Sequence, residues 1–408
     1  MKFPVHIFLV FGLMLLSGLV GGISWREAGY GSGPRDSSRA AEGPLREVAF
    51  VANAADGTVS LLDLASKQVL TTVDVIPDGK RVGPFRDIVQ WVAQPFLERR
   101  AGPNFVQDTD LSRDGRVLFV SRGHLGDVVA LDIVTGEVLW RTPVAGLFAG
   151  PMALSVDGQH LYIAATIRGD NRVEVLDSSN GERAGAIRAG QWPFAIQVSA
   201  DDSKVFVASL GDMQKQASER TEDRDAYQIA VVDSGSLKPE MIYRFESGVR
   251  PFQVAPDGRM LYAQLSALHG LVAVHLVSHQ RAGHIQLPVK PGVTEADWDF
   301  EAPHHGLALS GDGRLLCAAG RASDYAALVE VPALKLRGTV AVGDAPGWAA
   351  YAAADGLCLL ANSRSNDVSV VEVASQREIK RIPVGRFPNH ITVGFVPEAM
   401  LGSTLGSE

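Results

Sequence analysis

The sequence lacks the short motifs that mark the common enzyme classes. It contains no His-Glu-x-x-His pair, no Cys-x-x-Cys-His haem attachment, no glycine-rich phosphate loop and no nucleophile elbow. Each of these motifs sets a metal ligand, a haem thioether, a phosphate cradle or a nucleophile at a fixed spacing. Their absence weighs against a covalently bound c-type haem and against the common hydrolases, and it leaves open whether the chain is an enzyme.

Positive charge is also in short supply. The 408 residues carry 38 Lys and Arg against 46 Asp and Glu, a net charge of −8 at pH 7. Generic binding to nucleic acid or to an anionic membrane needs a basic face. We therefore expect no generic nucleic-acid binding, and membrane contact only through the N-terminal segment if that segment is retained.

Long apolar runs are missing except at the N-terminus. Lys2 precedes the largely apolar stretch Val5–Val20, and small residues follow it up to Ser24. About sixteen apolar positions fit a signal peptide better than a full membrane span of about twenty. We predict that residues 1–24 are an export signal or an uncleaved anchor, that 25–46 form a flexible spacer, and that the protein is periplasmic or otherwise extracytoplasmic.

What the chain does contain is a repeat of roughly 43 to 56 residues. Its clearest marks are Asp-Gly pairs that each separate two short apolar strands, at Asp114, Asp157, Asp257, Asp312 and Asp355. A glycine in such a hairpin turn tolerates positive φ. Repeats of this length with four strands each are typical of a β-propeller. The sequence predicts an all-β fold, a seven-bladed β-propeller over residues 47–397, with four antiparallel strands per blade.

The seventh blade must be assembled from both ends of the chain. The first repeat, from Val48 to Val73, has a second, third and fourth strand but no first strand. The segment Pro388–Val393 matches the first strands of other repeats. We therefore expect the C-terminal strand to pair with the N-terminal blade and close the ring, which removes exposed sheet edges. Residues 398–408 are left as a tail.

Two repeats and one inner strand carry a family resemblance. The segments Asn171–Asp177, Asn366–Val373 and Pro303–Gly313 resemble the YVTN-repeat β-propeller family over about Glu47 to Pro397. That family is related in fold to the propellers of quinoprotein amine dehydrogenases and of cytochrome d1, which bind partners or cofactors on one face. The resemblance is specific for the fold and weak for function.

The two cysteines lie in consecutive repeats. Cys317 lies two residues after Leu315, and alignment of the Asp-Gly turns places Cys358 at the position of Leu315. This alignment gives both side chains the same strand phase, on equivalent faces of adjacent blades. We predict buried, reduced thiols that are separated by a sheet, without a disulfide.

The extra residues of the chain gather at one rim of the predicted propeller, the top. Three insertions fall there: Ile76–Asn104, Gly211–Tyr227 and Pro288–Pro303. In the first insertion, Phe85, Ile88, Val89 and Val92 follow helical spacing and predict a short amphipathic lid or buttress that ends at Pro95. Loops on a rigid scaffold carry function, so the top face is the expected site.

One position of the inner strands forms a column at the mouth of the central channel. The candidate binding residues at and beside this column are Gln107, Asp108, Phe194, Arg250, His304, His305, Trp348, Asn389 and His390. Imidazoles, an indole, a guanidinium and a carboxylate around one funnel could bind a partner or a small ligand. His305 and His390 could also ligate haem iron or copper, act in proton transfer, or simply bond to a neighbouring blade.

These observations lead to two functional hypotheses. The first is an exported accessory or scaffold propeller that binds a partner protein or small ligand on its top face. The alternative is a periplasmic oxidoreductase or cofactor-handling protein with a histidine-lined metal or haem site at the channel mouth.

Overall fold

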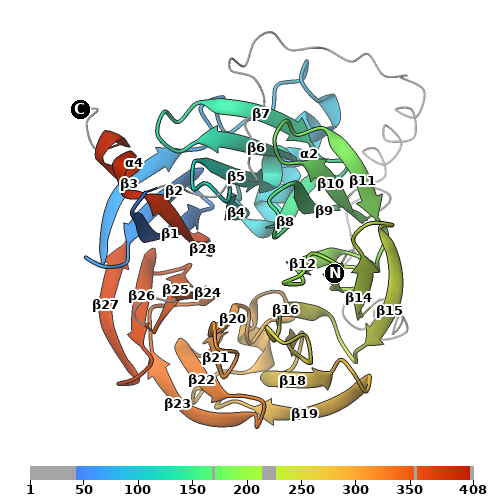
Figure 1. Ribbon diagram of the computed structural model, residues 1–408, viewed down its shortest axis with the longest axis vertical. Coiled ribbons are helices and arrows are strands. Elements are labelled where there is room, and N and C mark those ends of the chain that lie inside the picture. Colours follow the sequence, from blue (N-terminus) through green and yellow to red (C-terminus); the bar gives the residue numbers. More distant parts are fainter. Residues whose placement is uncertain (1–42, 168–170, 214–226, 353–355, 405–408) are drawn as a thin grey trace.

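The fold is the predicted seven-bladed β-propeller (Figure 1). The computed structural model describes residues 43–167, 171–213, 227–352 and 356–404. Each blade is one four-stranded antiparallel sheet, and the sheets surround a central axis. The predicted leader, residues 1–24, and most of the predicted spacer lie outside the described residues.

The strands follow each other from the axis to the rim within each blade. Blade one contains β28 (Pro388–Pro397), β1 (Leu45–Asn53), β2 (Thr58–Asp63) and β3 (Gln68–Asp74), and blade two contains β4 (Asp108–Leu111), β5 (Val117–Arg122), β6 (Asp127–Asp132) and β7 (Val138–Pro143). Blade three contains β8 (Phe148–Leu154), β9 (His160–Thr166), β10 (Arg172–Asp177) and β11 (Arg183–Ile187). Blade four contains β12 (Pro193–Val198), β13 (Lys204–Ser209), β14 (Gln228–Asp233) and β15 (Lys238–Arg244). Blade five contains β16 (Val249–Val254), β17 (Met260–Leu265), β18 (Gly270–His275) and β19 (Gln280–Gln286). Blade six contains β20 (Leu307–Leu309), β21 (Leu315–Gly320), β22 (Tyr325–Glu330) and β23 (Lys335–Ala341). Blade seven contains β24 (Pro346–Ala352), β25 (Leu357–Asn362), β26 (Asp367–Glu372) and β27 (Arg377–Pro383).

The predicted closure of the ring is confirmed. Strand β28 lies at the inner edge of blade one and pairs antiparallel with β1, from Leu45 opposite Pro397 to Asn53 opposite Pro388. Strand β1 begins at Leu45, two residues inside the predicted spacer, and the helix α4 (Glu398–Thr404) follows β28 in the predicted tail. The two ends of the described chain therefore share one sheet.

The turns between first and second strands repeat one small hydrogen-bonded unit. In blade six, the hydroxyl of Ser310 donates to Asp312 Oδ1 at 2.6 Å, and the same carboxylate oxygen accepts the backbone N–H of Arg314. Gly313 follows with a φ of 69°, in the left-handed region that glycine enters without steric cost. In blade four, Asp201 takes the place of the acid and Asp202, with a φ of 58°, takes the place of the glycine.

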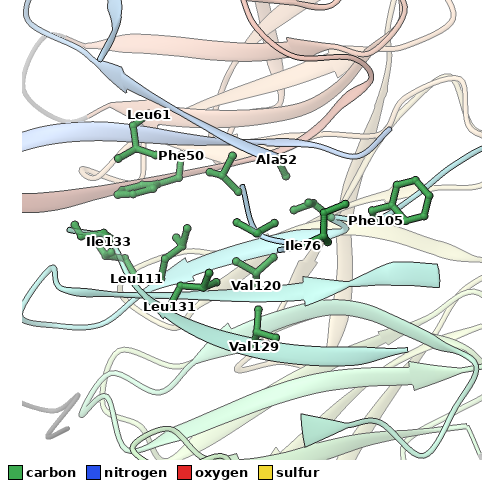
Figure 2. Close-up of a cluster of buried hydrophobic side chains, with 14 of the residues drawn as sticks. Phe50, Ala52, Leu61, Ile76, Phe105, Leu111, Val120, Val129, Leu131 and Ile133 are labelled. Carbon is green, nitrogen blue, oxygen red and sulfur yellow. The ribbon is translucent and has the colours of Figure 1, made fainter. Parts of the chain in front are cut away.

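The core consists of apolar clusters between adjacent blades. Along β5, Leu118 and Val120 pack toward blade one, whereas Val117 and Phe119 pack toward blade three. Figure 2 shows the first of these clusters, in which Phe50 and Leu61 of blade one meet Val120 and Val129 of blade two. Strands buried on both faces read as nearly continuous apolar runs, which is how they appear in the sequence.

Side chains on the inner strands also link one blade to the next. Gln197 Oε1 of β12 accepts the N–H of Val254 at 2.9 Å, and Gln253 Nε2 of β16 donates to the carbonyl of Leu307 at 2.9 Å. These bonds fix the inner strands relative to one another, so side chains at the channel mouth are held on a rigid frame.

The prediction of two reduced thiols is wrong. Cys317 and Cys358 form a disulfide with a Cα–Cα distance of 6.4 Å, and both are fully buried between blades six and seven. The error comes from the alignment of the turns. The N–H of Ser310 bonds to the carbonyl of Leu315, and Ala352 pairs with Leu357, so Leu315 and Leu357 are the equivalent residues.

The Asp-Gly pair is displaced by one residue between these two blades. Asp312 lies three residues before Leu315, whereas Asp355 lies two residues before Leu357. Because side chains alternate along a strand, a slip of one residue moves Cys358 to the opposite face. Cys317 therefore faces blade seven while Cys358 faces blade six, and the two share one apolar cluster.

The predicted helix in the first insertion is present as α2 (Ile88–Ala101), but two expectations about it are wrong. The helix begins at the N-cap Asp87, whose carboxylate accepts the N–H groups of Val89 and Gln90, and it continues through Pro95 to Ala101. Its buried residues are Gln90, Ala93 and Gln94, whereas the large apolar residues Ile88, Trp91, Val92 and Phe96 are exposed. Within the described ranges, no helix is both long and apolar enough to cross a membrane.

Candidate functional site

A row of aromatic and imidazole rings lines the channel mouth. The rings of Phe194 and His305 lie 5.5 Å apart between centroids, those of His305 and Trp348 lie 5.8 Å apart, and those of Trp348 and His390 lie 4.0 Å apart. They come from blades four, six, seven and one. The inner strands of different blades thus bring together side chains that are nearly two hundred residues apart in the sequence.

Arg250 adds a cation at one end of this row. Its side chain is buried, its Nε donates to the hydroxyl of Ser266 at 3.0 Å, and its guanidinium carbon lies 5.9 Å from the centroid of the Phe194 ring. A guanidinium over an aromatic face is attracted to the partial negative charge that the ring quadrupole places on that face.

A carboxylate stands at the other end of the row. Asp108 Oδ1 lies 2.8 Å from Nδ1 of His390, in a close contact that lacks the alignment of a hydrogen bond. The carboxylate is held in place because Oδ1 accepts the N–H of Thr109 at 2.6 Å and Oδ2 accepts the N–H of Met152 at 2.8 Å. With Nδ1 facing the acid, the other ring nitrogen of His390 is the one left for a ligand.

Two amide side chains complete this end of the site. Asn389 Nδ2 donates to Gln107 Oε1 at 3.1 Å, which links blade one to blade two beside Asp108. Asn104, from the first insertion, also donates to Gln107 Oε1, at 2.6 Å. We call the set formed by Gln107, Asp108, Phe194, Arg250, His305, Trp348, Asn389 and His390 the funnel.

His305 is held as a neutral imidazole with a defined tautomer. Its Nδ1 lies 2.8 Å from the carbonyl oxygen of Gly347, which can only accept, so Nδ1 carries the proton and Nε2 carries the lone pair. Burial, together with the positive charges of Arg250 and Arg321, holds the pKa of His305 well below its usual value. The bond to Gly347 is the inter-blade contact weighed in the sequence analysis, and it leaves Nε2 available.

His304 does not join the funnel, because adjacent residues point to opposite sides. It is fully buried between blades five and six, where its Nε2 lies 3.1 Å from Nδ1 of His269 and 3.2 Å from the hydroxyl of Tyr325. Burial, followed by the neighbouring His269, holds the pKa of His304 well below its usual value. His269 was not singled out in the sequence, since it lies in the loop between β17 and β18, away from any inner-strand column.

A buried ion network on the top face was also missed. Arg122, at the end of β5, is 1% exposed; its Nε donates to Asp127 at 2.7 Å and its Nη1 donates to Asp78 at 2.6 Å. Burial alone would raise the pKa of Asp78, but Arg122, Arg86 and Arg141 hold it below its usual value. The network ties the first insertion to blade two, so its role is to position the insertion.

The donor atoms at the funnel limit which metals it could hold. The described residues contain no group of three or more His, Cys, Asp or Glu side chains placed to bind a metal ion. Trp348 lies between His305 and His390, so these two imidazoles do not form a ready chelating pair. Copper and zinc centres need three or four such ligands, whereas a haem brings four nitrogens of its own and needs one axial imidazole. Among the described residues, the donor set at the funnel is therefore compatible with a single axial imidazole for a haem and supplies no three-ligand set for copper.

Comparisons with known proteins support the β-propeller fold and do not show YVTN repeats; a PQQ-type family model matches part of the chain. Residues 55–207 match the family model described as outer membrane protein assembly factor BamB, which is less than half of the chain. No curated protein sequence matches.

Two solved structures illustrate the similarity of fold. Hydrazine synthase of Kuenenia stuttgartiensis has 15% sequence identity and a TM-score of 0.61, over 80% of this chain and 92% of that one. Dihydro-heme d1 dehydrogenase NirN in complex with DHE has 15% identity and a TM-score of 0.55, over 86% of this chain and 66% of that one. At this level of identity the likeness establishes the fold alone.

Proposed function

We propose that this protein is an exported propeller whose funnel binds a small, planar, anionic ligand, with a haem-type tetrapyrrole as the ligand class that fits best. The observation that carries the proposal is the unbroken row of rings from Phe194 to His390 with Arg250 at one end. Flat aromatic side chains and an arginine on a rigid frame form a surface for a conjugated molecule that carries carboxylates.

The funnel residues have separable roles in this proposal. Trp348 and Phe194 would contact the plane of the ligand, and Arg250 would pair with a carboxylate. His305, kept neutral, offers Nε2 as an acceptor or axial ligand. His390 offers its second nitrogen, and Asp108 lies 2.8 Å from the first, where a small rotation of the ring would form the carboxylate–histidine hydrogen bond often found behind metal-ligating histidines. A bound haem would supply redox chemistry or would itself be the molecule carried.

The similarity of fold to a haem-related enzyme is consistent with a cofactor-handling role. One solved relative is a dihydro-heme d1 dehydrogenase. The disulfide between Cys317 and Cys358 favours an oxidising compartment, in agreement with the export signal expected at residues 1–24.

The second candidate is an accessory or scaffold protein that binds another protein on the top face. It is favoured by the match of residues 55–207 to the family model of BamB, an outer membrane protein assembly factor. The two candidates differ in one measurement, because a protein-binding scaffold would be colourless and would not change the spectrum of added haem.

A haem titration of the full chain tests the first candidate. We expect saturable binding of added haemin with a shifted Soret band, and weaker binding by at least tenfold in His390→Ala or Trp348→Ala. The matched control is His284→Ala, since His284 is an exposed histidine on the outer strand β19. If the spectrum of haemin does not change on addition of the wild-type protein, or if the funnel variants bind as His284→Ala does, the proposal is refuted and the scaffold remains.

A further inference from the structure

Helix α2 is inverted relative to an ordinary surface helix. Its buried side is polar, with Gln90 and Gln94 only 3% and 1% exposed, whereas Ile88, Trp91 and Phe96 are 62%, 48% and 54% exposed. A surface helix normally buries its apolar stripe and presents its polar side to water. A large exposed apolar patch marks an interaction surface.

The orientation of α2 is fixed by hydrogen bonds. Gln90 Nε2 donates to the carbonyls of His124 and Leu147, at 2.6 Å and 3.0 Å, and Gln94 Oε1 accepts the N–H of Val82 at 3.2 Å. Rotation of the helix about its axis would break these bonds and leave buried amides unpaired. These hydrogen bonds therefore keep the apolar side of the helix exposed and prevent it from being buried against blade two.

The outward side is continuous and ends in positive charge. Ile88, Val92 and Phe96 are spaced by four residues, Trp91 lies beside them, and Phe85, just before the helix, is 103% exposed. We call these five residues the α2 stripe. Arg99, which continues the side that carries Trp91, and Arg100 are both exposed in the last turn.

The acidic groups of this segment do not offset the two arginines at the outward side. The carboxylate of Asp87 caps the helix N-terminus, and Glu98 accepts a hydrogen bond from Gln94 and lies 3.6 Å from Arg81. The charge of the whole chain is −8, yet the charge beside the stripe is positive.

We propose that the α2 stripe docks this protein on a lipid bilayer with anionic headgroups. Trp and Phe side chains with aliphatic neighbours favour the boundary between headgroups and acyl chains, and arginines at the edge pair with lipid phosphates. Phe85 projects fully from the surface, and it could insert into a bilayer because lipid needs no preformed pocket to surround such a side chain. The negative net charge argues against adsorption of the whole molecule to an anionic membrane. The apolar stripe and the two arginines beside it provide a local surface that is both apolar and positively charged.

Vesicle binding of the full chain with two different readouts tests this proposal. Because the N-terminal segment could itself bind lipid, the first readout is quenching of tryptophan fluorescence by brominated phospholipids in phosphatidylcholine–phosphatidylglycerol vesicles. We expect a quenched component that is lost in Trp91→Phe. The second readout is the vesicle partition coefficient, which should fall about tenfold in Phe96→Ser and about fivefold for each of Arg99→Gln and Arg100→Gln.

The matched control is Phe395→Ser, since Phe395 is 48% exposed on β28, away from α2. This variant should partition as the wild type does. Absence of Trp91 quenching together with equal partition of Phe96→Ser and Phe395→Ser would overturn the proposal. So would a wild-type dimer in vesicle-free solution that Phe96→Ser converts to a monomer, because the stripe would then be covered by a second copy.

Discussion

Cys317 of blade six and Cys358 of blade seven are joined across the interface between two sheets, 41 residues apart in the chain. Each lies on the second strand of its blade, and the two strands present opposite faces to each other. The bond therefore adds a covalent link between two repeats that are also held by apolar packing and by hydrogen bonds such as that from His305 to Gly347.

The first prediction concerns this disulfide. Replacement of both cysteines by alanine should lower the free energy of unfolding by about 4 kcal/mol, because a closed loop of 41 residues no longer restricts the unfolded chain. Denaturant melts of the variant and the wild type measure the difference. Alkylation of unfolded protein should modify no cysteine before reduction and two afterwards; two modified cysteines without reductant would contradict the structure.

The second prediction concerns ring closure. A chain that ends at Arg386 lacks β28, so β1 loses one of its two partner strands and becomes the exposed inner edge of blade one. We expect broad unfolding or aggregation on heating. The control ends at Thr404, which keeps β28 and α4. If the chain ending at Arg386 melts as cooperatively as the control, β28 does not close the ring in solution.

The third prediction separates binding from folding. His305→Ala should change stability by about 1 kcal/mol, since it removes one hydrogen bond at a partly buried site. Leu307→Ala in the same strand should cost roughly 2 to 5 kcal/mol, because Leu307 is 3% exposed and leaves a cavity. The variant at His305 should lose haemin binding, and the variant at Leu307 should retain it at temperatures where it is folded. Equal destabilisation with intact binding in His305→Ala would make this histidine a structural residue.

The fourth prediction concerns pH. Burial lowers the pKa of His124 from 6.5 to about 4, and its ring packs against Phe148. Above pH 6.5 both the folded and the unfolded chain hold this histidine neutral. Between pH 6.5 and pH 4 only the unfolded chain takes up the proton, so stability falls as the pH falls through this window.

The loss attributable to His124 should be about 2 kcal/mol at pH 5. Denaturant melts between pH 7 and pH 5 should show this slope reduced in His124→Gln and unchanged in His284→Gln, whose histidine is exposed. An unchanged slope in His124→Gln would mean that the buried imidazole is not neutral as proposed.

The sequence by itself determined what depends on neighbouring residues. Alternation of apolar side chains, the Asp-Gly turns and the repeat length gave the blades, and the missing first strand of repeat one gave the closure by β28. The inner-strand column placed His305, Trp348 and His390 together, because one register position recurs at the same radius in every blade.

Only the tertiary structure decided which face of an element meets which neighbour. One residue of displacement in the turn before Leu357 put Cys358 on the side of Cys317, and no local pattern shows such a displacement. His304 turned away from the channel toward His269 for the same reason of alternation. In α2, helical spacing identified Phe85, Ile88 and Val92 of the apolar stripe but missed Trp91 and Phe96. The carbonyls of His124 and Leu147 accept hydrogen bonds from Gln90, which holds the stripe toward solvent. Those carbonyls come from other segments of the chain, so the hydrogen bonds that orient the helix can form only once the blades have assembled.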